Sequence, residues 1–82
     1  MNEPRYRIGT LARLTGVTTH AIRIWERRYR ALVPSRTAGG ARLYTDSDVQ
    51  RLCLVKKLLE RGYTISAVAK LDIAELARLA PL

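Results

Sequence analysis

Two helical patterns separated by a Thr-Gly turn constrain this fold more than any other feature of the chain. The first pattern covers residues 8–14, and the second, which is rich in arginine, covers residues 18–30. The turn at Thr15-Gly16 is short, which keeps the two helices together as one motif. Gly16 suits the left-handed backbone conformation that often ends a helix. We therefore predict a helix-turn-helix over about residues 9–30.

A hairpin is predicted after the second helix. Pro34 ends helical structure, because proline lacks a backbone N–H and clashes with the preceding turn. Gly39-Gly40 is typical of a hairpin turn, and Arg36-Thr37 and Arg42-Leu43-Tyr44 flank it. We expect this wing to cover about residues 34–44.

Capping residues indicate where the helices begin. Thr10 is the expected N-cap of the first helix, after a short strand at Tyr6-Arg7-Ile8, and Thr18 or Thr19 is the expected N-cap of the second. Supporting helices over about residues 46–80 should begin after three further caps: Thr45 with Asp48, Thr64, and Asp72 with Glu75. The chain is thus predicted to be one domain, residues 1–82, mostly α with a small β-hairpin: a winged helix-turn-helix.

The second helix has two faces. The apolar face should pack on the core: Ile22, Trp25 and Tyr29. The basic face should be exposed: Arg23, Arg27 and Arg30. Glu26 precedes Arg30 by four residues, the favourable order for a local ion pair. On the first helix, Leu11 and Leu14 are expected to face the core.

Positive charge is concentrated in the first half of the chain. Residues 1–44 hold nine Arg and two Glu, a net charge of +7, whereas residues 45–82 have a net charge of +1. Twelve of the fifteen cationic side chains are Arg, whose forked guanidinium matches phosphates and guanine edges. An even spread would indicate a solvated surface, but a surplus in one half indicates a binding surface for a polyanion. A helix with arginines on one face fits the major groove of DNA.

The composition argues against several other classes of protein. Cys53 and His20 are the only residues of their types, so an intrachain disulfide, a metal cluster or a catalytic nucleophile–base pair cannot be assembled, and we do not expect an enzyme. Cys53 is read as a buried packing residue in reduced surroundings. No apolar run approaches membrane-spanning length and the amino terminus lacks a signal-peptide core, so we expect a cytoplasmic protein with no membrane partner.

Four motifs follow one another along the chain: Ile8-Gly9-Thr10-Leu11-Ala12, Arg23-x-Trp25-Glu26, Pro34-x-Arg36 and Arg42-x-Tyr44-x-x-x-Asp48. Together they resemble the amino-terminal DNA-binding domain of MerR-family transcription regulators, over residues 6–75. The segment Ile24-Trp25-Glu26-Arg27-Arg28-Tyr29 is most similar to the repressors of carotenoid synthesis, whose full-length members carry a cobalamin-binding light sensor. The sensor and the long dimerisation helix of the family are absent from these 82 residues. We therefore expect no cofactor in this chain, and a monomer.

The resemblance also implies roles for individual residues. By position, Arg23 matches the Arg of the recognition helix, and Arg36 and Arg42 match the cations of the wing. The full set of predicted DNA-contacting residues is Thr10, Thr18, Thr19, His20, Arg23, Arg27, Arg36, Arg42 and Tyr44. The threonines can equally be helix caps only, although hydroxyls and free amides at a helix start also suit a phosphate. Tyr44 either packs under the wing or offers its hydroxyl to a phosphate, and Trp25 is expected in the core.

The function predicted from the sequence is sequence-specific binding of double-stranded DNA by a bacterial transcription regulator, of the repressor type. Two alternatives remain open. One is a basic module that docks an acidic, DNA-mimicking protein, because carboxylates can imitate a phosphate array. The other is an excisionase-like architectural factor that bends DNA with the same fold.

Overall fold

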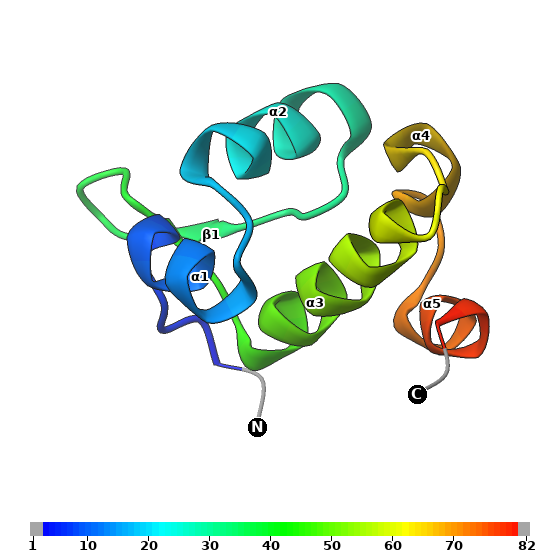
Figure 1. The fold of residues 1–82 in the computed structure, drawn as a ribbon. Coiled ribbons are helices and arrows are strands. Elements are labelled where there is room, and N and C mark those ends of the chain that lie inside the picture. Colours follow the sequence, from blue (N-terminus) through cyan, green and yellow to red (C-terminus); the bar gives the residue numbers. More distant parts are fainter. Residues whose placement is uncertain (1–2, 81–82) are drawn as a thin grey trace.

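The computed structural model describes residues 3–80 and contains five helices and one two-stranded sheet in that range. The elements in chain order are α1 (Ile8–Thr15), α2 (Thr19–Tyr29), β1 (Ser35–Arg36), β2 (Arg42–Leu43), α3 (Asp46–Glu60), α4 (Ile65–Val68) and α5 (Ile73–Leu79). Figure 1 shows α1 and the hairpin at one end of α3, and α4 and α5 at its other end. The predicted winged helix-turn-helix, mostly α with a small β-hairpin, is confirmed.

Helix α1 begins earlier than the sequence indicated. Its N-cap is Arg7, which has an extended backbone and makes no side-chain cap, so Thr10 lies inside the helix and its assignment as N-cap is wrong. The strand expected at residues 6–8 is also wrong. Ile8 already belongs to α1, and the only pairing made by this segment is an isolated bridge between Tyr6 and Tyr44.

The turn between α1 and α2 has the predicted geometry. Gly16 has φ of 74°, in the left-handed region, and its N–H donates to the Ala12 carbonyl oxygen at 2.8 Å. Glycine is favoured there because other residues rarely adopt this conformation. Thr18 is the N-cap of α2, with its Oγ1 accepting from the Ala21 N–H at 3.1 Å. Of the two threonines considered for this cap, the first therefore has the role.

The wing is an antiparallel hairpin closed by a glycine turn. The paired residues are Ser35 with Leu43 and Arg36 with Arg42. Gly40 has φ of 88°, and its N–H donates to the Thr37 carbonyl oxygen at 2.9 Å. Reciprocal backbone bonds between Tyr6 and Tyr44, at 2.8 and 3.0 Å, then attach the amino-terminal segment to the base of the wing. The wing is thus held by the segment that leads into α1.

Two apolar clusters form the core, and Trp25 packs against both. The first joins α1, α2 and the wing to α3: Leu11, Val17, Ile22, Leu32, Tyr44 and Leu52. The second joins α3 to α4 and α5: Val55, Leu58, Val68, Leu76 and Ala80. Leu14 is 50% exposed, so its prediction as a core residue is wrong, and Cys53 is only half-buried. No helix between residues 3 and 80 has the length and apolar character needed to cross a bilayer.

The supporting helices begin where the capping residues predicted. Thr45 with Asp48, and Asp72 with Glu75, form complete capping boxes, and Thr64 caps α4. Each box satisfies backbone N–H groups that the first turn of a helix leaves without partners. These boundaries could be predicted because the signal is local to each helix start.

Arg51 on α3 ties distant segments together through three carbonyl oxygens. Its Nε donates to Ala31 at 2.6 Å, and its two terminal nitrogens donate to Ala69 and Leu71, each at 2.5 Å. Burial lowers the pKa of this guanidinium below its usual value. Arg51 therefore joins the segment after α2 to the segment between α4 and α5.

Candidate nucleic-acid interface

The basic face of α2 is exposed, as predicted. The side chains of Arg23 and Arg27 are exposed, and neither has a hydrogen-bond or ion-pair partner within residues 3–80. The opposite face of the helix is buried through Ile22, which is fully inaccessible. The helix thus presents free guanidinium groups outward while its apolar side is fixed to the core.

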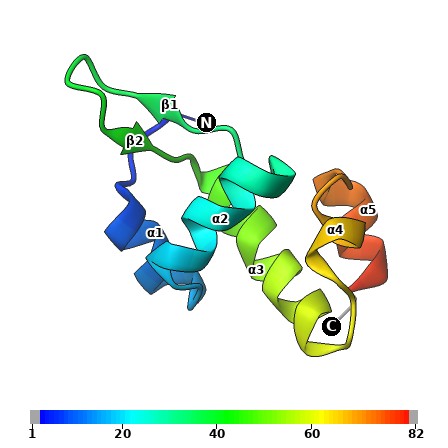
Figure 2. The ribbon, with the colours of Figure 1, turned by 90° about the horizontal axis from the view of Figure 1, so that it is seen from above.

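A groove brings α2 next to the wing and to the start of α1. Its volume is about 310 Å³, and its lining residues are Arg7, Ile8, Arg23, Gly40, Ala41 and Arg42. Figure 2 shows the three contributing elements from above, with the hairpin projecting beyond α1 and α2. Arg23 and Arg42, which the sequence placed on separate elements, therefore line one cleft.

The buried carboxylate of Glu26 joins α2 to the wing. Its Oε1 accepts from Arg42 Nε at 2.9 Å, and its Oε2 accepts from the Tyr44 hydroxyl. The Glu26 side chain is 8% exposed, so both bonds lie largely out of solvent. The ion pair predicted between Glu26 and Arg30 is wrong, because Arg30 has left the helix at φ of 51° and two donors of the wing hold the carboxylate instead.

Tyr44 belongs to the core and not to the contact surface. Its side chain has no exposed area, and its hydroxyl donates to Glu26. Of the two alternatives for Tyr44, the structure supports packing under the wing, and the predicted contact between Tyr44 and a phosphate is wrong. Burial, together with the bond to the Glu26 carboxylate, raises the pKa of the Tyr44 hydroxyl well above its usual value.

The polar residues at the start of α2 lie together at one helix end. Thr18 and His20 are exposed, Thr19 is half-buried, and the Thr18 hydroxyl oxygen is already used as the helix cap. Thr10 is a half-buried residue of α1. The predicted contacts at the α2 start therefore lie within its first turn, whereas Thr10 is on the neighbouring helix.

Arg36 lies on the wing but interacts with the hairpin itself. One of its terminal nitrogens donates to the Gly40 carbonyl oxygen at 2.9 Å. The Arg36 side chain remains exposed, so its other donors face solvent. Within the wing, the Arg36 side chain is bonded to the turn, while Arg42 lines the groove.

Sequence reasoning missed Arg7 as a candidate site residue. It was assigned to a strand, whereas the structure makes it the exposed residue immediately before α1, on the same groove as Arg23 and Arg42. Its position directly before the first helix of the motif was the available signal. That signal was weak, because Arg7 reaches the groove only when the segment before α1 pairs with the base of the wing.

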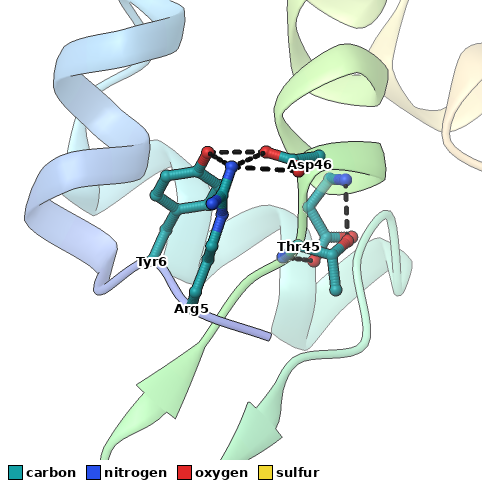
Figure 3. A network of polar contacts seen from close by, with 5 residues as sticks. Arg5, Tyr6, Thr45 and Asp46 are labelled. Carbon is teal, nitrogen blue, oxygen red and sulfur yellow. Dashed lines mark hydrogen bonds and ion pairs between the residues drawn. The ribbon is translucent and has the colours of Figure 1, made fainter. Parts of the chain in front are cut away.

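A second polar network, shown in Figure 3, fixes the amino-terminal segment to α3. The Tyr6 hydroxyl donates to Asp46 Oδ1 at 2.5 Å, and Arg5 donates to both Asp46 oxygens at 3.1 Å. These interactions, the Tyr6 bond first and Arg5 second, hold the pKa of the Asp46 carboxyl below its usual value. All three groups are solvent-accessible, so the network positions the segment without burying charge.

The geometry defines a class: a winged helix-turn-helix DNA-binding domain, with an arginine-bearing second helix beside a cationic hairpin. The chain belongs to the MerR family, since the family model described as "MerR HTH family regulatory protein" matches residues 6–75. No group of three or more His, Cys, Asp or Glu residues that could hold a metal ion occurs in the described part of the chain.

Individual relatives agree with this family assignment. The HTH-type transcriptional repressor CarH of Myxococcus xanthus is 51% identical over 71 residues, which are 87% of this chain and 24% of CarH. The HTH-type transcriptional regulator MlrA of Escherichia coli K12 is 39% identical over 66 residues, which are 80% of this chain and 27% of MlrA. The chain therefore spans about a quarter of the length of these two relatives.

A solved structure supports the fold independently. The crystal structure of a MerR-family transcriptional regulator from Bacillus cereus superimposes with a TM-score of 0.71 and covers 92% of this chain and 60% of that one. Its sequence identity is 23%, so it bears on the fold alone.

Proposed function

We propose that this domain binds one half-site of a double-stranded operator and represses transcription by covering promoter sequence. In this arrangement α2 enters the major groove and the wing follows the neighbouring backbone. The observation that supports it best is the groove lined by both Arg23 of α2 and Arg42 of the wing, because reading bases and binding the backbone require cationic groups on neighbouring elements. The repressor role is supported by the 51% identity to CarH.

The contacts divide into two kinds. Arg23, with Thr19 and His20 at the start of α2, approaches base edges and selects the site. The phosphate contacts supply affinity and come from Arg27, Arg36 and Arg42, with Thr10 and the Thr18 amide region as flanking groups. No catalytic step is assigned, and the site of action is the bacterial cytoplasm.

Footprinting on genomic promoter fragments, followed by salt titration on the protected sequence, tests this proposal. About five to seven phosphate contacts per domain predict a slope of log K against log salt of about −4 to −6. The net charge of +7 in residues 1–44 motivates that number of contacts. A slope near zero, or protection of no fragment, would contradict DNA binding.

Two arginines on α2 provide a matched pair of variants. Arg23→Ala should weaken operator binding more than random-DNA binding, by about 1–3 kcal/mol if Arg23 makes a forked contact to guanine. Arg27→Ala removes the same charge four residues along the helix and should weaken both DNAs equally, reducing the salt slope by about one unit. Arg42→Ala is a poorer probe, because it would leave the Glu26 carboxylate buried without its cation.

One domain reads one half-site, so the 82-residue chain should bind as a monomer without the avidity of a linked pair. Tethering a second copy can raise apparent affinity by roughly 10²–10⁴. Light scattering on the free chain, and a fusion with a dimerising segment after residue 82, would test this. A stable dimer of the chain at micromolar concentration would contradict it. Cobalamin, which the resemblance implies for full-length carotenogenesis repressors, is assigned to none of these residues.

A further inference from the structure

We propose that Arg7 is a further DNA-binding residue, which holds a backbone phosphate together with Arg42 in the groove between α1, α2 and the wing. This inference rests on the proposed function and adds one ligand to the interface. It assigns the part of the groove between Arg7 and Arg42 to a phosphodiester, and leaves Arg23 with its proposed role at the base edges.

The shape of the groove suits a phosphate. Its volume of about 310 Å³ is roughly ten times the ~30 Å³ that one water molecule takes in the liquid, which leaves room for a phosphate and part of its hydration shell. On the wing side, Gly40 has no side chain and Ala41 has only a methyl group, so these two residues leave the groove open. A DNA backbone passing along the wing can therefore enter it.

The positive charges around the groove favour the binding of an anion. Three arginines are among its lining residues, Arg7, Arg23 and Arg42, and within the described part of the chain only Arg42 has an acidic partner, Glu26. Within residues 3–80, Arg7 and Arg23 have no ion-pair or hydrogen-bond partner. Like charges gathered around one cleft repel one another unless a counter-charge occupies it. A phosphate supplies that charge and accepts forked hydrogen bonds from arginine.

The Arg42 side chain is oriented for this contact by Glu26. Its Nε is used in the 2.9 Å bond to Glu26, and no other acceptor for Arg42 occurs among the described residues. The two terminal nitrogens therefore remain available on the side chain that lines the groove. Arg7 faces the same space from the start of α1.

Within residues 3–80, the Arg7 side chain makes no contact that would give it a structural role. It is exposed, and as the N-cap residue of α1 it makes no side-chain cap. Its carbonyl oxygen accepts from the Leu11 N–H at 3.0 Å, a bond that any residue can make. Arg7→Gln should therefore leave the fold intact and remove only the cation, with a thermal midpoint equal to or slightly above that of the unmodified chain.

The first test compares Arg7→Gln with Arg78→Gln in salt titrations on operator and random DNA. Arg78 is also exposed and without a partner among residues 3–80, but it lies on α5, far from the wing along the fold in Figure 1. Arg7→Gln should weaken binding to both DNAs by the same factor and reduce the salt slope by about 0.9. Arg78→Gln should leave the slope unchanged. Equal slopes for the two variants would overturn the assignment of Arg7.

The second test locates the phosphate. Single methylphosphonate substitutions through the half-site remove one backbone charge at a time. One position should weaken Arg7→Gln clearly less than it weakens the unmodified chain, because only the Arg42 contact remains there. Every other sensitive position should have the same effect in both. An unchanged profile in Arg7→Gln would overturn the proposal.

Titration with inorganic phosphate separates a DNA phosphate from a free anion as the occupant. Amide shifts at Gly40 and Ala41 that need Arg7, combined with a wild-type DNA slope in Arg7→Gln, would mean that the groove takes free anions only, and would overturn the proposal. Failure of the proposed function is distinct, since the unmodified chain would then show no salt-dependent DNA binding at all.

Discussion

The Tyr44 hydroxyl, at the base of the wing, donates a hydrogen bond to the carboxylate of Glu26 on α2. The same carboxylate accepts from Arg42, so one acidic group receives two donors from the wing. Buried polar groups need such partners, since a desolvated carboxylate without donors is costly. The orientation of the wing relative to α2 is therefore fixed inside the protein before DNA arrives.

Tyr44→Phe removes one of the two donors while keeping the buried ring. Because the lost bond is to a charged acceptor, we expect the free energy of unfolding to fall by about 1.5–3 kcal/mol. Urea denaturation would measure it, with Tyr63→Phe as the control, since Tyr63 is exposed. Equal stabilities for the two variants would mean that the Tyr44–Glu26 bond contributes nothing.

Alkaline pH should destabilise the fold through the same residue. The pKa of Tyr44 is raised in the folded protein by burial and by Glu26, so above the usual value of about 10 the unfolded chain loses this proton while the folded chain keeps it. The stabilisation is complete below that value and is lost as pH rises above it, at up to about 1.4 kcal/mol per pH unit. In Tyr44→Phe this part of the decline should be missing. Denaturation midpoints measured from pH 8 to 11 in both proteins would show the difference.

Local signals explain which parts of the fold could be predicted from the sequence. The caps at Thr45, Thr64 and Asp72 act within a few residues, as does the left-handed glycine at position 16, and all four have the expected geometry. Thr10 carries the same residue-type signal, yet α1 begins at Ile8. The pairing of the preceding segment with Tyr44, a contact across the chain, sets that helix start instead.

The candidate site divides in the same way. The exposed arginines of α2 follow from helical periodicity. The partner of Glu26 does not, because the local spacing favoured Arg30 and the structure supplies Arg42, sixteen residues away. The place of Arg7 on the groove likewise depends on tertiary contacts between α1 and the wing. Such contacts have no periodic signature in a single sequence.

Asp46 should titrate below the usual range for an aspartate. The hydrogen bond from Tyr6 is the largest single cause, and Arg5 adds both a hydrogen bond and its charge, so Tyr6→Phe and Arg5→Gln should each raise the pKa of Asp46. Since the folded-state pKa is depressed, the associated stability is present above the unfolded pKa of Asp46 and is lost as pH falls through the folded value. NMR titration of the Asp46 side-chain carboxyl measures the shift. An unchanged pKa of Asp46 in either variant would contradict the role assigned to that residue.

The two leucines of α1 should respond very differently to truncation. Leu11 is fully buried in the first cluster, whereas Leu14 is half-exposed. Leu11→Ala should lower the free energy of unfolding by about 2–5 kcal/mol, because it removes buried methyl groups and leaves a cavity. Leu14→Ala should change it by about 0.5 kcal/mol or less. Chemical denaturation of the two variants would show whether Leu14 is exposed, as in the structure, or packed in the core, as helical spacing suggested.

Arg51 should resist even conservative replacement. Its guanidinium reaches the carbonyl oxygens of Ala31, Ala69 and Leu71 at once, which requires donors fanned out in a plane. A lysine ammonium keeps the charge but is a compact group on one atom, and it cannot reach acceptors on two separate segments. At least one of these three carbonyl groups would lose its hydrogen-bond donor, at a cost of about 1–3 kcal/mol.

Arg51→Lys should therefore destabilise the chain by about that amount, and Arg51→Met by more. Lys57→Met, an exposed change on the same helix, should be nearly neutral. Hydrogen exchange gives a second readout: protection should fall at Ala31, whose N–H donates to the Trp25 carbonyl oxygen, and around residues 69–71. If Arg51→Lys matched the unmodified chain in both stability and exchange, the charge of Arg51 alone, and not its fork of donors, would hold the two segments together.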